Sequence, residues 1–305
     1  MKVVVLFRLL FWVGFSSTVF SQSRLDSFLR PADSLNTSRR LGVVVSEATL
    51  STAALVGLHE LWYSDYEKSA FQFKDDNNDW FQVDKAGHMY SAYHLGRFSA
   101  ELFSWAGISK RDQMWYGATY GFAFLTAVEV FDGHSEAWGF SWGDVAANAT
   151  GTLLYVSQEL LWDEQRVVPK FSFHSTRYAA QRPELLGEGF GERLIKDYNG
   201  QTYWLSVNLH SFAKESRIPK WLNVALGYGA TGMLSATAQS NSPILEHVPV
   251  RTRQFYLSLD IDLTRIETQS AFLRTLFSVF NTLKIPAPAF EINGLGQTKW
   301  HAIYF

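Results

Sequence analysis

The sequence predicts an α+β protein, with an N-terminal four-helix bundle-like domain followed by a β-rich C-terminal region that contains a short helix. The first observation is that no proline occurs between Pro31 and Pro169, in a stretch rich in Ala, Leu, Phe and Glu. Because proline interrupts a helix at a cost of about 3 kcal/mol, this stretch is expected to be helical. The second observation is that the runs beyond Pro169 are short and alternate apolar with polar residues, as half-buried strands do. The boundary is expected within residues 163–185.

Residues 1–21 are predicted to form a signal peptide. A positive start is followed by an apolar stretch from Val3 to Phe15, which Arg8 interrupts. Val19 and Ser21 then stand at the positions that a signal peptidase recognises. The apolar stretch is short for a membrane span, which needs about 20 residues, so an uncleaved anchor is the alternative. We therefore expect the protein in the periplasm, in possible association with the outer membrane.

Four helices are expected within residues 36–163. Their predicted ranges are Ser38–Tyr63, Asp84–Trp105, Ser109 or Lys110 to Phe131, and Ser141–Trp162. The fourth begins with a Ser-x-x-acid capping pattern. The longest uncharged runs of the third and fourth helices are Gln113–Val128 and Val145–Gln158, both shorter than the roughly 20 residues of a membrane span. Buried bundle helices are the prediction, and insertion into a membrane is the alternative.

The β-rich region is expected to occupy residues 185–305 and to pack as an accessory layer on the helices. Its predicted strands are Gln201–Ser211, Asn223–Gly229, Gln254–Leu263 and Lys299–Phe305, and its predicted short amphipathic helix is Ser270–Leu283. In the third of these strands the polar residues Tyr256, Ser258, Asp260 and Asp262 share one face, opposite an entirely apolar one.

Several polar residues stand at helix ends where an apolar bundle should not contain them, and short connections could bring these ends together. The candidate catalytic residues are Asp84, His88, Glu129 and Asp144; the candidate binding residues are Lys85, Asp132, Ser141 and Asn148; the candidate metal ligands are Asp84, His88, Glu129 and Asp132. Carboxylates and imidazole suit a divalent metal, and a carboxylate beside histidine can act as a general base. Helix capping and a buried hydrogen-bonded network explain the same residues without catalysis.

No strongly diagnostic catalytic motif is present in the sequence, such as His-Glu-x-x-His, Gly-x-Ser-x-Gly or a phosphate-binding Gly-x-x-x-x-Gly-Lys. The acidic run from Asp75 to Asp79 lacks the glycine and the terminal glutamate of a calcium loop, and is predicted to be a solvated loop. Gly117 and Gly121 form a Gly-x-x-x-Gly ridge that favours close helix packing.

The spaced motifs within residues 40–160 resemble a known family. They are Asp84-Lys85-Ala86-Gly87-His88, Tyr116-Gly117, Glu129-Val130-Phe131-Asp132-Gly133, and Phe140 to Val145 followed by Asn148 and Gly151. They look like the signature of the YfiM-like envelope proteins, a domain of unknown function described for periplasmic lipoproteins, in the long version of Bacteroidetes-type envelopes. More distantly, their order is similar to that of VanZ-like membrane proteins. The resemblance implies an envelope location and a helical domain, and it brings no activity.

Composition narrows the function. The net charge of −2 offers no basic field for nucleic acid, and the sequence has no cysteine, so no lipid anchor through cysteine is expected. With 16% aromatic and only 18% charged residues, much apolar surface must be covered. We expect an exported cell-envelope protein that binds lipid, a lipid-linked molecule or an envelope protein. The alternative is a metal-assisted hydrolase acting on lipid or cell-wall material with a divalent metal.

Overall fold

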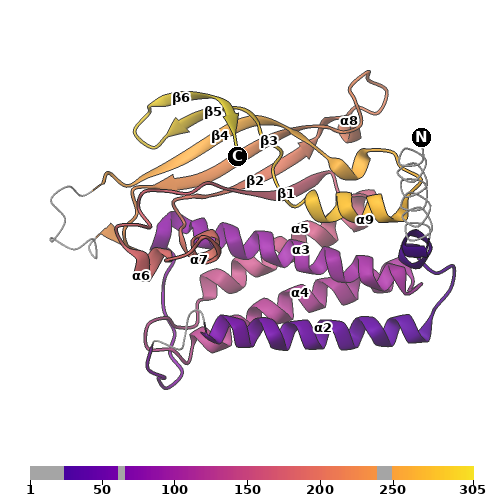
Figure 1. The fold of residues 1–305 in the computed structure, drawn as a ribbon, viewed down its shortest axis with the longest axis horizontal. Coiled ribbons are helices and arrows are strands. Elements are labelled where there is room, and N and C mark those ends of the chain that lie inside the picture. The colour runs from indigo at the N-terminus through magenta and orange to yellow at the C-terminus, as the bar shows by residue number, and fades with distance from the viewer. Residues whose placement is uncertain (1–23, 61–65, 239–248) are drawn as a thin grey trace, which may run out of the picture.

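The computed structural model describes residues 24–60, 66–238 and 249–305, and the predicted signal peptide lies outside them. Helices form one layer and an antiparallel sheet forms the other, with α3 between the sheet and the remaining helices (Figure 1). The predicted α+β class, with helices first and a β-rich region after them, is confirmed.

The four predicted helices are present, with ends close to those expected. They are α2 (Thr37–Leu58), α3 (Val83–Trp105), α4 (Lys110–Asp132) and α5 (Trp142–Trp162). The side chains of Ser109 and Ser141 cap α4 and α5 by accepting hydrogen bonds from the backbone N–H groups three residues on.

Glycine lets α3 approach both neighbouring helices closely. A Cβ atom on Gly117 of α4 would lie 2.2 Å from the carbonyl oxygen of Gly96, and one on Gly151 of α5 would lie 2.0 Å from that of Met89. Both distances are too short for any side chain, so the predicted close packing at Gly117 is present. This contact sets the spacing of α3, α4 and α5, whose ends carry the polar residues of interest.

The described residues of the C-terminal region form one six-stranded antiparallel sheet in the order β1-β2-β3-β4-β5-β6. The strands are β1 (Val167–Phe173), β2 (Gln201–Asn208), β3 (Leu222–Thr231), β4 (Thr252–Ile261), β5 (Ala287–Asn293) and β6 (Thr298–Tyr304). The helices among them are α6 (Pro183–Leu186), α7 (Phe190–Lys196), α8 (Leu209–Phe212) and α9 (Ala271–Phe280). The sequence did not predict β1 and β5, and β1 lies before the expected range of 185–305.

The sheet is polar inside and apolar outside. On β4, Phe255, Leu257 and Leu259 are 46%, 49% and 52% exposed, whereas Asp260 and the other residues on the opposite face are buried. Asp260 forms an ion pair with Lys170 of β1 at 2.8 Å, and both side chains are fully buried. The predicted separation of polar and apolar faces on this strand is therefore present, with the polar face turned inward.

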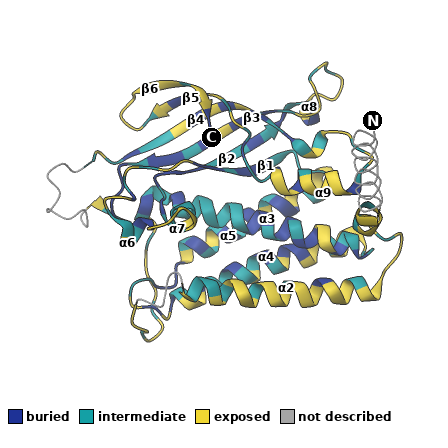
Figure 2. Ribbon diagram, viewed as in Figure 1, coloured by how far each residue is buried: buried dark blue, intermediate teal, exposed yellow. Residues whose placement is uncertain are grey.

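Helix α2 lies at the outer edge of the bundle and is mostly exposed (Figures 1 and 2). Within it, Val43 is buried, and its contact with α3 is far less extensive than that between α3 and α4. Among the described helices α2 is long and apolar enough to cross a membrane, by length and composition.

Candidate functional site

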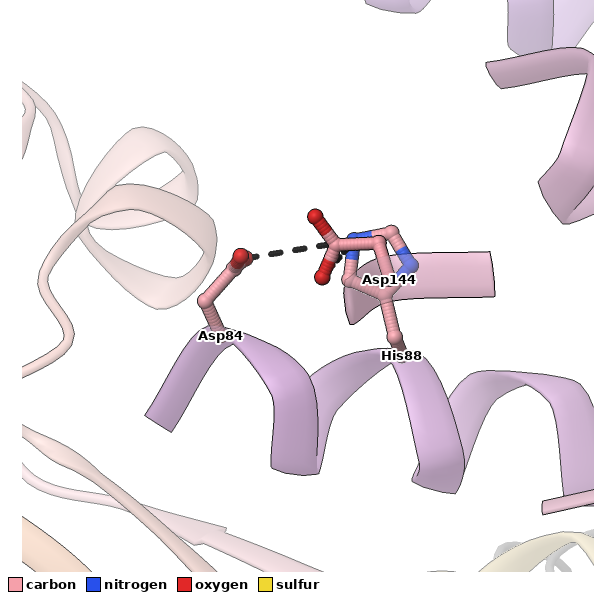
Figure 3. Close-up of side chains that lie close together, drawn as sticks. All are labelled: Asp84, His88 and Asp144. Atoms are coloured by element: carbon pink, nitrogen blue, oxygen red, sulfur yellow. Dashed lines mark ion pairs between the residues drawn. The ribbon is translucent and has the colours of Figure 1, made fainter. Parts of the chain in front are cut away.

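Three helix ends meet and bring the predicted polar residues together. Asp84 and His88 lie on the first two turns of α3, Asp144 lies in the first turn of α5, and Glu129 lies in the last turn of α4. One ligand atom from each of Asp84, His88 and Asp144 lies within 4.8 Å of those of the other two, and Figure 3 shows the three side chains converging from α3 and α5. The expected convergence of helix ends therefore occurs.

Lys85 is the cationic centre of this cluster. Its Nζ lies 2.8 Å from Asp76 Oδ2, 2.8 Å from Asp144 Oδ1 and 3.3 Å from Asp84 Oδ2. Burial alone would lower the pKa of Lys85, but the charges of Asp84 and Asp144 outweigh it and raise that pKa above its ordinary value. The ammonium is therefore charged at any physiological pH and holds the two helix starts together.

His88 lies between an amide and the carboxylates. Its Nδ1 is 3.1 Å from Asn148 Oδ1, and because an amide oxygen only accepts, Nδ1 carries the proton. Its Nε2 is 3.7 Å from Asp144 Oδ1 and 3.9 Å from Asp84 Oδ1. Burial lowers the pKa of His88, but the charges of Asp84, Asp144 and Glu129 outweigh burial and raise it.

Glu129 is 1% exposed and behaves as a neutral acid. Its Oε2 accepts a hydrogen bond from the backbone N–H of Ser141 at 3.3 Å, and its Oε1 is 3.7 Å from His88 Nδ1. Burial raises the pKa of Glu129 to about 8, against the opposing effect of His88 and with further raising by Asp144 and Asp132. Burial also raises the pKa of Asp144, to about 6. The site therefore contains carboxyl groups that exchange protons near neutral pH.

Two buried polar atoms of the site have no hydrogen-bond partner within the described part of the chain. They are Glu129 Oε1 and Asn148 Nδ2, and Asn148 is fully buried. An unpaired buried donor or acceptor costs about 1–3 kcal/mol, so such atoms mark places where a ligand or water completes the structure. Both belong to residues that flank His88.

Two further residues belong to the site although the sequence did not single them out. Asp76 pairs with Lys85 and accepts a hydrogen bond from Ser141 Oγ at 2.5 Å. Tyr198, which follows α7, donates to Asp84 Oδ1 at 2.9 Å. The prediction that the acidic run containing Asp76 is a solvated loop is therefore wrong at this residue, because Lys85 binds the Asp76 carboxylate. Asp132 lines the neighbouring cavity.

The chain enters α3 through an unusual backbone. Trp80, Phe81 and Gln82 have φ of 48°, 51° and 62°, a left-handed conformation that costs each non-glycine residue of order 1–3 kcal/mol. The Phe81 carbonyl accepts a hydrogen bond from the Tyr228 hydroxyl of β3, and Gln82 accepts one from Arg253 of β4 at 2.8 Å. The sheet thereby fixes the conformation that places Asp84 two residues later.

A cavity of about 620 Å³ opens from this cluster into the space between the helices and the sheet. Asp84, His88 and Asp144 lie in its wall, and so do Asp76 and Lys74. Much of the remaining wall is apolar and comes from several elements, including Leu95 and Phe98 of α3, Phe124 and Val128 of α4, Phe171 of β1 and Ile195 of α7. A volume of this size is typical of small-molecule pockets, and the cavity is charged on one part of its wall and apolar on another.

Asp84, His88 and Asp144 have the chemistry of divalent-metal ligands, with two carboxylates and a histidine Nε2 whose opposite nitrogen is engaged by Asn148. Nε2 lies 3.7 and 3.9 Å from the carboxylate oxygens, so ligation at about 2.0–2.2 Å from a shared ion would require the side chains to close in slightly. Lys85 neutralises the same carboxylates and competes with any ion. Of the predicted metal ligands, Asp84 and His88 belong to this group, while Glu129 faces the other ring nitrogen.

Comparison with known proteins bears on the part of the chain that carries the cluster. Residues 73–158 match the family described as Predicted periplasmic lipoprotein (DUF2279). The match begins just before the acidic run and ends within α5, so it includes Asp76, Lys85 and Asp144, and the sheet lies outside it. The family description agrees with the predicted periplasmic location and with a domain of unknown function. No curated protein and no solved structure matches the chain.

Proposed function

We propose that this is an exported protein of the cell envelope that binds an amphiphilic envelope molecule, a lipid or a lipid-linked compound, in the cavity beside the Asp84–His88–Asp144 cluster. A periplasmic location is supported by the description of the family that residues 73–158 match. Association with the outer membrane and binding of an envelope protein are further parts of the proposal. Since the sequence has no cysteine, membrane attachment relies on the folded surface and not on a cysteine-linked lipid.

The observation that carries this proposal is the division of the cavity wall into a charged and an apolar part. With Asp76, Asp84 and Asp144 ionised, Lys85 and His88 protonated, and Glu129 neutral, the cluster carries a net charge of about −1. Such a site favours a ligand whose polar end donates hydrogen bonds or carries positive charge. The apolar wall accepts a hydrocarbon chain, whose burial contributes about 0.8 kcal/mol for each CH₂ group.

The experiment is to purify the protein from envelope membranes, extract it with organic solvent and identify bound lipids by mass spectrometry. Leu95→Trp fills the apolar wall and is expected to abolish co-purification of the ligand. The matched control is Leu257→Trp on the exposed face of β4, which should retain the ligand. Equal retention by both variants, with thermal unfolding unchanged, would contradict the proposal.

A metal-assisted hydrolase acting on lipid or cell-wall material is the second candidate, and the convergence of Asp84, His88 and Asp144 favours it. A divalent ion held there would lower the pKa of a bound water toward neutrality and so supply a nucleophile. Titration calorimetry with Zn²⁺ and Mn²⁺ tests the idea. Binding should be lost in His88→Gln and kept in the control His134→Gln, an exposed histidine outside the cluster. Absence of binding to the unmodified protein would rule this candidate out.

A further inference from the structure

Helix α2 has its polar residues turned inward and its apolar residues turned outward. Glu47 and Ser51 follow Val43 on the inward side, and the Ser51 hydroxyl lies 2.9 Å from that of Tyr120 in α4. The outward side chains of Leu41, Val44, Val45, Leu50 and Val56 are 49–66% exposed. A helix on a water-soluble protein shows the opposite arrangement, with the apolar face toward the core.

The outward hydroxyl groups of α2 do not need water. Thr49 Oγ1 donates to the carbonyl of Val45 and Thr52 Oγ1 donates to the carbonyl of Ala48, each at 2.8 Å. These bonds within the helix satisfy the only polar hydrogen that each threonine side chain carries. From Leu41 to Leu58, Glu47 is the charged residue, and it faces inward.

Helices α4 and α5 repeat this reversal. Their inward-facing polar residues are buried: Glu129 of α4, and Asp144, Asn148 and Gln158 of α5. Their most exposed apolar side chains are Trp115, Tyr116 and Val130 of α4 and Leu153, Leu160 and Leu161 of α5, each 43–71% exposed. Together with the five outward residues of α2, these six side chains form a surface that we name the outer helical face.

Charged residues bound the outer helical face at both ends. At one end Arg39 of α2 donates to the carbonyl of Trp105, where α3 ends, and Lys110 of α4 pairs with Asp163 after α5 at 2.5 Å. At the other end lie Asp132 and Asp144, near the cavity that also contacts Leu58. The uncharged zone therefore begins and ends together in all three helices.

We propose that the outer helical face is embedded in the hydrocarbon of an envelope membrane. A protein partner or a second copy would cover a patch, whereas this uncharged zone extends over three helices and stops at charges in each of them. The 22 residues of α2 extend about 33 Å, comparable with the roughly 30 Å of bilayer hydrocarbon. The basic residues at the Arg39 end suit the anionic headgroups at a bilayer surface. Insertion of this face into hydrocarbon does not depend on what the cavity binds.

The absence of cysteine from the sequence makes a direct test possible. Single variants Leu50→Cys and Leu153→Cys, on α2 and α5, are labelled with a fluorophore and reconstituted into vesicles of phosphatidylethanolamine and phosphatidylglycerol. Brominated acyl chains should quench both labels, and aqueous iodide should not. The control Glu267→Cys, whose native side chain is 81% exposed, should show the reverse.

Quenching of all three labels by iodide alone would overturn the proposal, as would shielding of Leu50→Cys from both quenchers with a dimer found by light scattering. A second measurement is the partition of the unlabelled protein into the same vesicles. Leu50→Glu should reduce the bound fraction at least tenfold, whereas Leu295→Glu, in the β5–β6 turn and 59% exposed, should change it less than twofold. Equal effects of the two substitutions would also refute it.

Discussion

Replacing Lys85 by methionine removes the cation that joins three carboxylates and should strongly destabilise the protein. The Lys85 side chain is 13% exposed and that of Asp144 is 5% exposed, so water cannot take over the role of the ammonium. Breaking a buried ion pair by removing one partner costs about 3–5 kcal/mol, because the remaining charge is left buried and uncompensated. At about 2–4 °C per kcal/mol, a loss of 3 kcal/mol lowers the melting temperature by roughly 6–12 °C.

The assay is thermal unfolding followed by circular dichroism at pH 7 and at pH 5. The loss should shrink at the lower pH, because protonation of Asp144, whose pKa is about 6, removes one of the unpaired charges. Lys110→Met is the matched control: Lys110 also pairs with two acids, but it is 56% exposed, and its loss should cost less than about 1 kcal/mol. Similar melting temperatures for the two variants would refute the assignment of Lys85 as the centre of the cluster.

Three further predictions concern buried groups. Because the pKa of Glu129 is raised to about 8, the folded state keeps a proton between pH 4.5 and 8 that the unfolded state releases, so stability falls as pH rises through this window; Glu129→Gln should remove up to about 1.4 kcal/mol per pH unit of that slope in thermal unfolding at pH 5 and 8. Asp260→Asn leaves buried lysine charge unpaired and should cost about 3–5 kcal/mol, and no change in melting temperature would contradict this. Gly151→Ala places a methyl group against the carbonyl of Met89 and should destabilise by about 1–3 kcal/mol, whereas Gly42→Ala, with open space around it, should stabilise the α2 helix by about 0.5–1 kcal/mol; a calorimetric result of the opposite order would refute the helix spacing.

The helices were predictable because their signals are local. The absence of proline and the capping pattern at Ser141 are read along the chain, and they place helix ends within a few residues. β1 was missed because Pro169 argues against a strand; the structure accommodates it at the sheet edge, where its carbonyl accepts a hydrogen bond from His94 at 2.7 Å. The alternation along β4 predicted two unlike faces, but it could not say which face is buried.

The candidate site was predictable as a group of residue types at helix ends, but its pairings depend on tertiary structure. The sequence placed Asp84, His88 and Asp144 at ends that could meet, and they do. It gave no sign that Asp76, within a polar loop, pairs with Lys85, or that Tyr198 reaches Asp84 from far along the chain. Local patterns carry no information about such long-range partners.

The last residue of α2, Leu58, forms part of the cavity wall, although α2 contacts the rest of the bundle sparingly. The position of α2 and the occupancy of the cavity are therefore thermodynamically linked. A ligand that contacts Leu58 binds more tightly when α2 is docked, and by reciprocity its binding favours the docked position by the same factor. Membrane lipids that hold α2 in place would thus act as effectors of the cavity, and hydrogen exchange of the α2 amides would report its occupancy from outside.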